Sequence, residues 1–150
     1  MTIDAPCLMI AAGGTGGHIF PAVAVADCLR EKGWRVVWLG SKGGLEERLV
    51  PMQNIELHLL PITGLRGKSA ITLLAAPWRI FTSVMQARRL IRQSNVSVVL
   101  GMGGFASGPG GVAAKLTGTP LVLHEQNAIA GFTNRVPVSY THLRAHETVL

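Results

Sequence analysis

The chain has 150 residues, a length that suits one domain built around one hydrophobic core. Hydrophobic residues make up 48% of the sequence and charged residues only 15%, a balance that argues against intrinsic disorder. Two cysteines, Cys7 and Cys28, are too few for a disulfide framework, and we interpret both as reduced thiols packed in the interior.

The net charge of +6 is unevenly distributed along the chain. Residues 57–124 carry seven Lys and Arg residues and no Asp or Glu. This excess favours an anionic partner such as nucleic acid, acidic lipid or a phosphorylated substrate, with an ordinary solvated basic surface as the alternative. No run reaches the ~18 apolar residues that span a bilayer, and the start of the chain lacks a signal-peptide pattern, so we expect a cytoplasmic protein.

Short apolar runs alternate with amphipathic runs along the chain. Runs rich in Val, Ile and Leu between helices are typical of parallel strands covered on both faces, so we predict an α/β fold with a doubly wound, Rossmann-like sheet. Gly33 should end the first helix, and Pro77 should kink or restart the third. The predicted strands are Cys7–Ala12, Arg35–Leu39, Ile55–Pro61, Val96–Leu100 and Pro120–His124, and the predicted helices are His18–Lys32, Gly44–Val50, Ala70–Gln93 and Gly108–Leu116.

A glycine-rich turn, residues 13–18, joins the first strand to the first helix. Glycine lets the backbone approach a ligand closely, and the N–H groups at a helix start favour an anion such as phosphate. Ile19 stands where a G-x-G-x-x-G motif from Gly14 needs its last glycine, and no Gly-Lys-Ser/Thr follows, so neither a dinucleotide fingerprint nor a Walker A motif is present. His18 is the best candidate base, because the helix dipole favours a neutral, proton-accepting imidazole. The alternatives are a tight connection and a histidine that only caps the helix.

A second glycine-rich loop, residues 101–111, directly follows the fourth strand. Two such turns at the carboxyl ends of parallel strands could form two walls of a diphosphate cradle. Ser107 could cap the helix that follows. Two ordinary tight connections are the alternative.

The polar segment 124–127 follows the last strand and should reach the same crevice. Glu125 could bind a ligand hydroxyl or act as a base, and Asn127 offers both a donor and an acceptor. The alternative is a polar turn whose groups bind one another.

The predicted helix 70–93 carries two apolar stripes. A surface helix normally buries one stripe, so the second indicates either complete burial or a face that meets lipid or a partner. Aromatic residues beside Arg79 suit a membrane interface. One stripe holds Ile71, Leu74, Trp78, Phe81 and Met85, and the nearly opposite one holds Leu73, Ile80, Val84 and Ile91.

Residues 136–150 lack the apolar periodicity of the rest, and we interpret them as a non-native tail. A metal pair at His142 and His146 is disfavoured because no other ligand cluster accompanies it.

Five segments together resemble the MurG family of peptidoglycan glycosyltransferases: GGTGGHIFPAVAVA, LPITGLRGK, APWRIF, VVLGMGGFASGPGGVAA and VLHEQNAIAGFTNR. The resemblance covers nearly all of residues 7–135 in order. It implies a GT-B fold of two Rossmann-like domains, with residues 1–135 as an incomplete N-terminal, acceptor-side domain and the C-terminal UDP-sugar domain absent. Members transfer N-acetylglucosamine from UDP-GlcNAc to undecaprenyl-diphospho-muramoylpentapeptide (lipid I to lipid II), as peripheral proteins on the cytoplasmic face of the bacterial membrane.

The resemblance also implies roles for residues at matching positions. His18 matches the proposed general base, and Glu125 matches a carboxylate of the cleft. The family uses no bound cofactor, no catalytic metal and no nucleic acid partner. The expected UDP-sugar contacts are Thr15, Gly16, Gly17 and Asn127, and Gly14 is a further expected substrate contact. The expected contacts of the acceptor diphosphate are Gly103 and Gly104. The expected membrane contacts are Ile71, Leu74, Trp78, Arg79 and Phe81.

Three other functions compete with this interpretation. The first is a non-catalytic module that binds nucleotide or lipid diphosphate, because half a cleft rarely catalyses and these 150 residues alone are expected to be inactive. A dehydrogenase is disfavoured, because Gly40, Ser41 and Lys42 follow the second strand where an acidic ribose ligand would stand. A nucleic-acid binder would explain the charge but not the two glycine loops.

Overall fold

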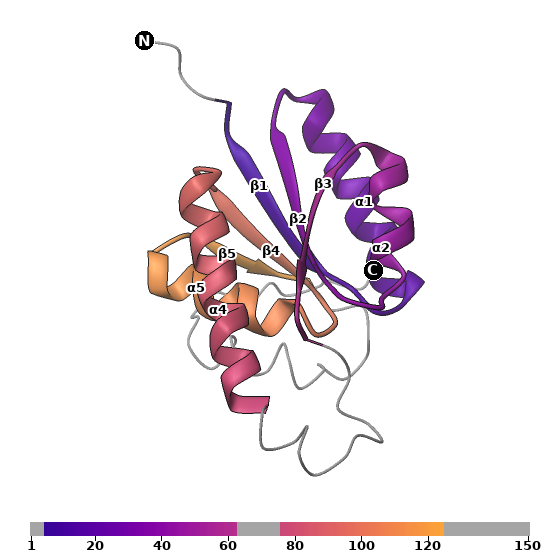
Figure 1. Ribbon diagram of the computed structural model, residues 1–150. Helices are drawn as coiled ribbons and strands as arrows, with labels where there is room; N and C mark the ends of the chain where they lie inside the picture. The colour runs from indigo at the N-terminus through magenta and orange to yellow at the C-terminus, as the bar shows by residue number, and fades with distance from the viewer. Residues whose placement is uncertain (1–4, 63–75, 125–150) are drawn as a thin grey trace, which may run out of the picture.

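A computed structural model of the protein describes residues 5–62 and 76–124 (Figure 1). Within these ranges, five parallel strands form one sheet in the order β3-β2-β1-β4-β5. The strands are β1 (Cys7–Ala12), β2 (Arg35–Ser41), β3 (Glu56–Leu60), β4 (Val98–Gly103) and β5 (Leu121–Leu123). The helices are α1 (Gly16–Glu31), α2 (Glu46–Leu49), α4 (Ala76–Gln93) and α5 (Ser107–Thr117), with a 3₁₀ turn η1 (Pro51–Gln53) after α2.

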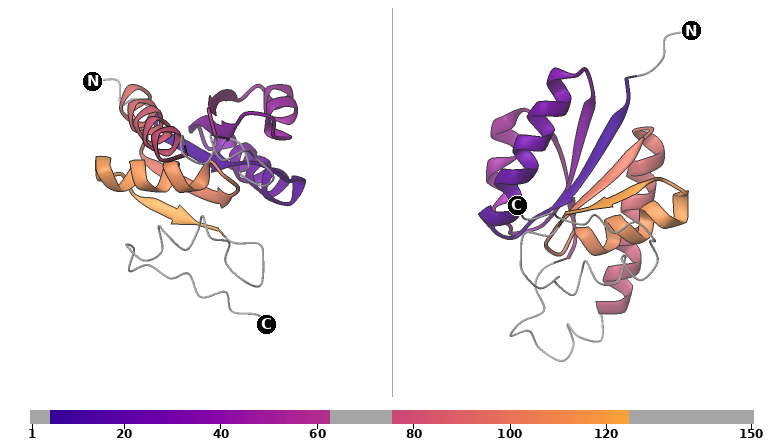
Figure 2. Two further views of the ribbon diagram at one scale, coloured as in Figure 1. Left: turned by 60° about the horizontal axis from the view of Figure 1, so that its bottom comes forward. Right: turned by 180° about the vertical axis from the view of Figure 1, so that it is seen from behind.

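The strand order reverses direction between β1 and β4, which pair with each other at the centre of the sheet. Helices α1 and α2 lie on one face of the sheet, and α4 and α5 lie on the other (Figures 1 and 2). This arrangement confirms the predicted doubly wound, Rossmann-like sheet. Ligands of such sheets bind beyond the carboxyl ends of the strands, at the point where the order reverses.

Strand β1 supplies both halves of the core, and all six of its residues are buried. Successive side chains of a strand point to opposite faces, so one uninterrupted apolar run can serve two layers. The residues Leu8, Ile10 and Ala12 pack with Ile19, Ala22 and Ala26 of α1, while Cys7, Met9 and Ala11 pack with Ala87, Leu90 and Ile91 of α4 and with Ala113 and Ala114 of α5.

Two helix boundaries follow from single residues. Gly33 ends α1 as predicted, with a φ of +81° and its N–H donating to the Arg30 carbonyl at 2.9 Å. The predicted helix 44–50 is only one α-turn, because Pro51 opens a 3₁₀ turn that ends at Asn54 with a φ of +54°. Pro77 lies in the first turn of α4, where proline is tolerated, and residues 70–75 of the predicted helix lie outside the described residues.

The two cysteines lie in different environments. Cys7 is completely buried, whereas Cys28 is exposed on α1. The prediction that both thiols pack in the interior is therefore wrong for Cys28. The physical reason is helical geometry: Cys28 lies two positions beyond the buried Ala26, about 200° around the helix axis.

In the described ranges, no helix is both long and apolar enough to cross a bilayer. The predicted tail 136–150, with His142 and His146, lies outside those ranges.

Candidate functional site

The two glycine turns lie side by side where the strand order reverses. The Gly13 N–H donates to the Gly103 carbonyl at 3.3 Å. A Cβ on Gly104 would overlap the carbonyl oxygen of Gly13, so only glycine permits this approach. The carboxyl ends of the strands converge at this edge of the sheet in Figure 1. The structure therefore brings the first turn and the second loop into one place, as the sequence predicts. The predicted bounds of that loop are wrong, because β4 continues to Gly103 and α5 already begins at Ser107, so only residues 104–106 connect them.

His18 connects the two turns. It belongs to the first turn of α1 and is half-buried. A Cβ placed on Gly103 would lie 2.8 Å from its Nδ1, so the imidazole rests against the backbone of the second turn. Gly103 and Gly104 have φ values of +101° and +82°, which disfavour any side chain at either position. The candidate base thus lies at the contact between the two candidate phosphate-binding loops.

The start of α1 presents an accessible face. Thr15 is the N-cap residue, its side chain makes no capping hydrogen bond, and it is exposed together with Gly17. Gly16 and Gly17 open the helix, so their N–H groups have no acceptor within it. Around Gly14, with a φ of +94°, a Cβ would meet nothing within 4 Å. The arrangement suits an anion approaching the helix N-terminus.

A buried carboxylate that sequence reasoning missed supports the first turn from below. Glu46 of α2 is completely buried, and its Oε2 accepts the Gly14 N–H at 3.0 Å. Its Oε1 accepts both the N–H and the hydroxyl of Ser41, each at 2.8 Å. The only signal in the sequence is a pair of glutamates at the start of a short helix, a pattern that usually means solvated side chains.

A buried serine supports the second turn. The Gly103 N–H donates to Ser107 Oγ at 2.8 Å, and that hydroxyl lies 2.8 Å from the Ala11 carbonyl and 2.9 Å from the Gly103 carbonyl. The prediction that Ser107 caps α5 is wrong, because Ala106 is the N-cap residue and Ser107 already lies within the helix. Its hydroxyl instead ties the second turn to the end of β1.

The third predicted segment is described only at its first residue. The His124 N–H donates to the Gly101 carbonyl at 2.9 Å, which places this residue beside the end of β4. The His124 side chain is exposed. Glu125 and Asn127 lie outside the described residues.

Helix α4 carries an exposed aromatic surface, as one of the two interpretations of its apolar stripes requires. Trp78 and Phe81 are 68% and 55% exposed, and their rings stack with centroids 5.7 Å apart. On the opposite stripe Val84 and Ile91 are buried, although Ile80 is 51% exposed. Burial on both sides is therefore wrong for α4. Ile71 and Leu74 of the predicted surface lie outside the described residues.

Basic residues continue this surface along α4. A hollow of about 500 Å³ is lined by Trp78, Phe81, Thr82, Met85, Gln86, Arg88, Arg89, Arg92 and Gln93. Arg79, in the same turn as Trp78, is exposed as well. Aromatic rings and guanidinium groups thus share one side of one helix.

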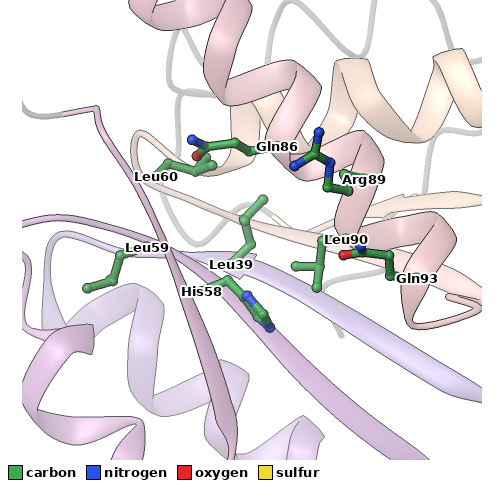
Figure 3. A pocket seen from close by; sticks show the side chains of 8 residues that line it. All are labelled: Leu39, His58, Leu59, Leu60, Gln86, Arg89, Leu90 and Gln93. Carbon is green, nitrogen blue, oxygen red and sulfur yellow. The ribbon is translucent and has the colours of Figure 1, made fainter.

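A smaller cavity of about 200 Å³ lies between the edge strand β3 and α4 (Figure 3). Its polar lining comes from His58 of β3 and from Gln86, Arg89 and Gln93 of α4. His58 Nε2 lies 2.7 Å from Glu56 Oε1, so this histidine already has a partner on its own strand. The lining shares no residue with the glycine turns. We therefore assign the candidate site to the turns and not to this cavity.

Among the described residues, no group of three or more His, Cys, Asp and Glu side chains is placed to hold a metal ion.

Known proteins resemble this chain in both sequence and fold. The glycosyltransferase family 28 N-terminal domain matches residues 8–143. A relative from Shewanella denitrificans, named UDP-N-acetylglucosamine–N-acetylmuramyl-(pentapeptide) pyrophosphoryl-undecaprenol N-acetylglucosamine transferase, is 56% identical over 138 residues. That match covers 91% of this chain and 38% of the relative. A relative of the same name from Mannheimia succiniciproducens is 55% identical over 127 residues, or 85% of this chain and 36% of the relative.

The crystal structure of Acinetobacter baumannii MurG superimposes on this chain with a TM-score of 0.81 and 45% sequence identity. The superposition covers 92% of this chain and 40% of that structure. The chain therefore spans well under half the length of the relatives that it matches.

Proposed function

The chain belongs to glycosyltransferase family 28 and aligns with its N-terminal domain, and from this premise we propose that it is the acceptor-side half of a GT-B enzyme. That enzyme transfers N-acetylglucosamine from UDP-GlcNAc to undecaprenyl-diphospho-muramoylpentapeptide, with inversion at the anomeric carbon. The observation that carries the proposal is the contact between His18 and Gly103, which joins a titratable base to two glycine turns. The names of the close relatives support the choice of substrates.

The two turns supply the binding of diphosphate. The N–H groups of Gly16 and Gly17, at the start of α1, are donors toward a negatively charged oxygen. Thr15, and Gly14 with its open outer side, complete this face toward the UDP-sugar. Gly103 and Gly104 bring the second turn against the first and form the wall that faces the acceptor diphosphate. By resemblance, Glu125 and Asn127 add contacts from the segment after His124.

His18 removes the proton from the acceptor's 4-hydroxyl as that oxygen attacks the anomeric carbon and UDP leaves. The imidazole nitrogen takes up the proton, and the departing UDP carries away the bonding electron pair. General-base catalysis of this kind is worth roughly 10²–10⁴-fold in rate. The mechanism needs no redox cofactor.

A chimera tests the proposed activity. Residues 1–124 would replace the matching part of the Shewanella denitrificans relative, of which the match to this chain covers 38%. We propose that the remaining length of that relative supplies the opposite side of the cleft. We expect transfer of labelled N-acetylglucosamine to the lipid-linked acceptor at a rate within about tenfold of the intact relative, a loss equal to about 1.4 kcal/mol of transition-state stabilisation. A folded chimera that binds UDP-GlcNAc but transfers nothing would support the alternative of a non-catalytic binding module.

Replacing the candidate base separates catalysis from binding. In the chimera, His18→Ala should lower kcat by roughly 10²–10⁴-fold while the KM for the acceptor stays nearly constant. His58→Ala is the matched control, since His58 lines the separate cavity beside β3. A His18→Ala variant with the kcat of the parent chimera would rule out His18 as the base.

We also propose peripheral attachment to an anionic membrane through the α4 surface, on the cytoplasmic face of the cell membrane. Exposed Trp78 and Phe81, with arginines beside them, support it, because aromatic rings settle at the lipid interface while guanidinium groups meet acidic headgroups. The same charge could serve nucleic acid, so oligonucleotide binding that falls steeply with salt would favour that partner instead.

Vesicle co-sedimentation tests the membrane proposal. The double variant Trp78→Ser, Arg79→Glu should lose most of its binding to vesicles containing phosphatidylglycerol. The pair Lys115→Glu, Leu116→Ser is the matched control, because it makes the same change in charge and removes another exposed apolar side chain, on α5. Equal binding by the two double variants would contradict the proposed surface.

A further inference from the structure

Glu46 is a buried acidic residue directly behind the first glycine turn. Its carboxylate is completely buried and accepts three hydrogen bonds, from the Gly14 N–H and from the N–H and hydroxyl of Ser41. Among the described residues, the basic side chains in salt-bridge contact with a carboxylate are Arg30, beside Asp27, and His58, beside Glu56. Glu46 is therefore held by neutral donors, and burying it is tolerable because those donors converge on both of its oxygens.

Three glycines make room for this carboxylate. A Cβ on Gly13 or on Gly44 would overlap the carboxylate oxygens, and a Cβ on Gly40 would lie 2.7 Å from the side-chain Cγ. These glycines come from the ends of β1 and β2 and from the loop before α2. The space that Glu46 occupies is therefore enough to require glycine at position 13.

The hydrogen bonds divide the first turn into two halves. The Gly13 N–H is used by the Gly103 carbonyl, and the Gly14 N–H is used by Glu46. The N–H groups of Gly13 and Gly14 are therefore already hydrogen-bonded within the protein. Gly16 and Gly17, at the start of α1, are left to meet an anion.

We propose that Glu46 is a positioning residue, which fixes the first turn so that the Gly16 and Gly17 amides and His18 face the second turn correctly. This inference rests on the proposed function of the two turns. Glu46 acts only through Gly14 and Ser41 and does not touch the substrate. A displacement of about 1 Å in a catalytic geometry costs roughly 10²-fold in rate, so a buried support of this kind should be visible in kcat.

The test compares two neighbouring glutamates in the chimera. Glu46→Gln keeps the shape of the side chain but turns an amide N–H₂ toward one of the main-chain donors. Glu47→Gln is the matched control, because Glu47 is exposed and accepts the Gly43 N–H at 2.9 Å. We expect Glu46→Gln to lower kcat by tenfold to a hundredfold, within the loss expected for a misplaced catalytic group. Glu47→Gln should stay within about twofold of the parent, because an exposed interaction contributes little.

A second measurement is independent of activity. Amide hydrogen exchange at Gly14 should become about tenfold faster in Glu46→Gln, the factor that one hydrogen bond of ordinary net strength supplies. The amides of β1 should keep the protection that they have in the parent.

Ser41→Ala removes one donor and leaves the carboxylate in place, so it provides a milder variant should Glu46→Gln unfold. We expect it to lower kcat about threefold, as a positioning role shared among three bonds implies.

The outcomes are distinguishable. Parental kcat in both Glu46→Gln and Ser41→Ala would overturn the positioning role while leaving the proposed function intact. Parallel loss of β1 protection and activity in both variants would also overturn it, since Glu46 would then only stabilise the fold. An inactive parent chimera would overturn the proposed function, and an unchanged exchange rate at Gly14 would then still overturn the role of Glu46.

Discussion

The two glycine turns look alike in the sequence but are held in place by different chemistry. The first is supported by a carboxylate 32 residues away, on a short helix beside β2. The second is supported by the hydroxyl of Ser107, four residues away and within the helix that the turn introduces. The first support is charged and depends on the tertiary fold, whereas the second is neutral and mostly local.

This difference indicates how each turn should respond to substitution. The first turn depends on a space that three glycines leave for one side chain, while the second depends on a backbone-to-backbone approach at Gly104. A side chain can shift slightly, whereas the Gly13 carbonyl belongs to the main chain directly after the buried strand β1 and can move only with that main chain. Substitutions in the second turn should therefore be the more costly ones.

The largest effect is expected at Gly104. Gly104→Ala places a Cβ on the Gly13 carbonyl and also strains a residue with a φ of +82°, so it should lower the free energy of unfolding by about 4 kcal/mol. Gly118→Ala is the matched control, with a φ of +70° and nothing within 4 Å, and should cost only about 1 kcal/mol. Urea unfolding measures both. Equal costs would show that the two turns do not touch as closely as described.

The next largest loss in the free energy of unfolding is expected at Gly13, and the adjacent Gly14 is its control. Gly13→Ala pushes a Cβ into the Glu46 carboxylate and should cost about 2–3 kcal/mol, because a buried, hydrogen-bonded side chain must move. Gly14→Ala meets no atom and should cost about 1 kcal/mol from its φ of +94° alone. Thermal or urea unfolding separates the two. A larger cost at Gly14 would refute the account of the space around Glu46.

Removing the hydroxyl that supports the second turn should lower the free energy of unfolding by less than Gly13→Ala does. Ser107→Ala leaves the Gly103 N–H without its acceptor and should cost about 2 kcal/mol. The control is Ser83→Ala, since Ser83 is equally buried but donates to the Arg79 carbonyl within its own helix. That loss should stay below about 1 kcal/mol. Similar losses at the two serines, by urea unfolding, would remove the special role of Ser107.

The smallest effect concerns the other end of β1, away from both turns. Burial raises the pKa of the Cys7 thiol, an effect opposed by the nearby Arg35 charge and reinforced by Glu56. Because the folded pKa is raised, the stability that the neutral thiol contributes is complete below the unfolded pKa and is lost as pH rises through the folded pKa.

Cys28, which is exposed, should react with iodoacetamide in the native chain, and Cys7 only on unfolding.

Labelling at Cys7 then reports global unfolding in each turn variant. Rapid native labelling of both thiols would contradict the described packing of β1.

The order of helices and strands could be predicted because the spacing of apolar residues in each run matches either a helix or a buried strand. Strand β1 was predicted with its observed bounds, and the helix that ends before Gly33 was predicted within two residues at its start. The pairing of two glycine turns also followed from the sequence, since both leave the carboxyl ends of strands in one parallel sheet. The exposure of Cys28 was missed because the prediction relied on the usual burial of free cysteine and not on its position around the helix relative to Ala26.

The sequence by itself determined the order of the elements, the glycine turns and the family to which the chain belongs. These three features depend on local propensity, periodicity and motif spacing, all of which can be read from the order of the residues. Only the tertiary structure decided that His18 lies against Gly103, that Ser107 holds a turn instead of capping a helix, and that Glu46 is buried beneath the first turn. The contacts of His18 and Glu46 join distant segments, and Ser107 reaches the Ala11 carbonyl, 96 residues away, as well as its own turn. A charged side chain becomes buried only where the fold gathers enough donors to replace water.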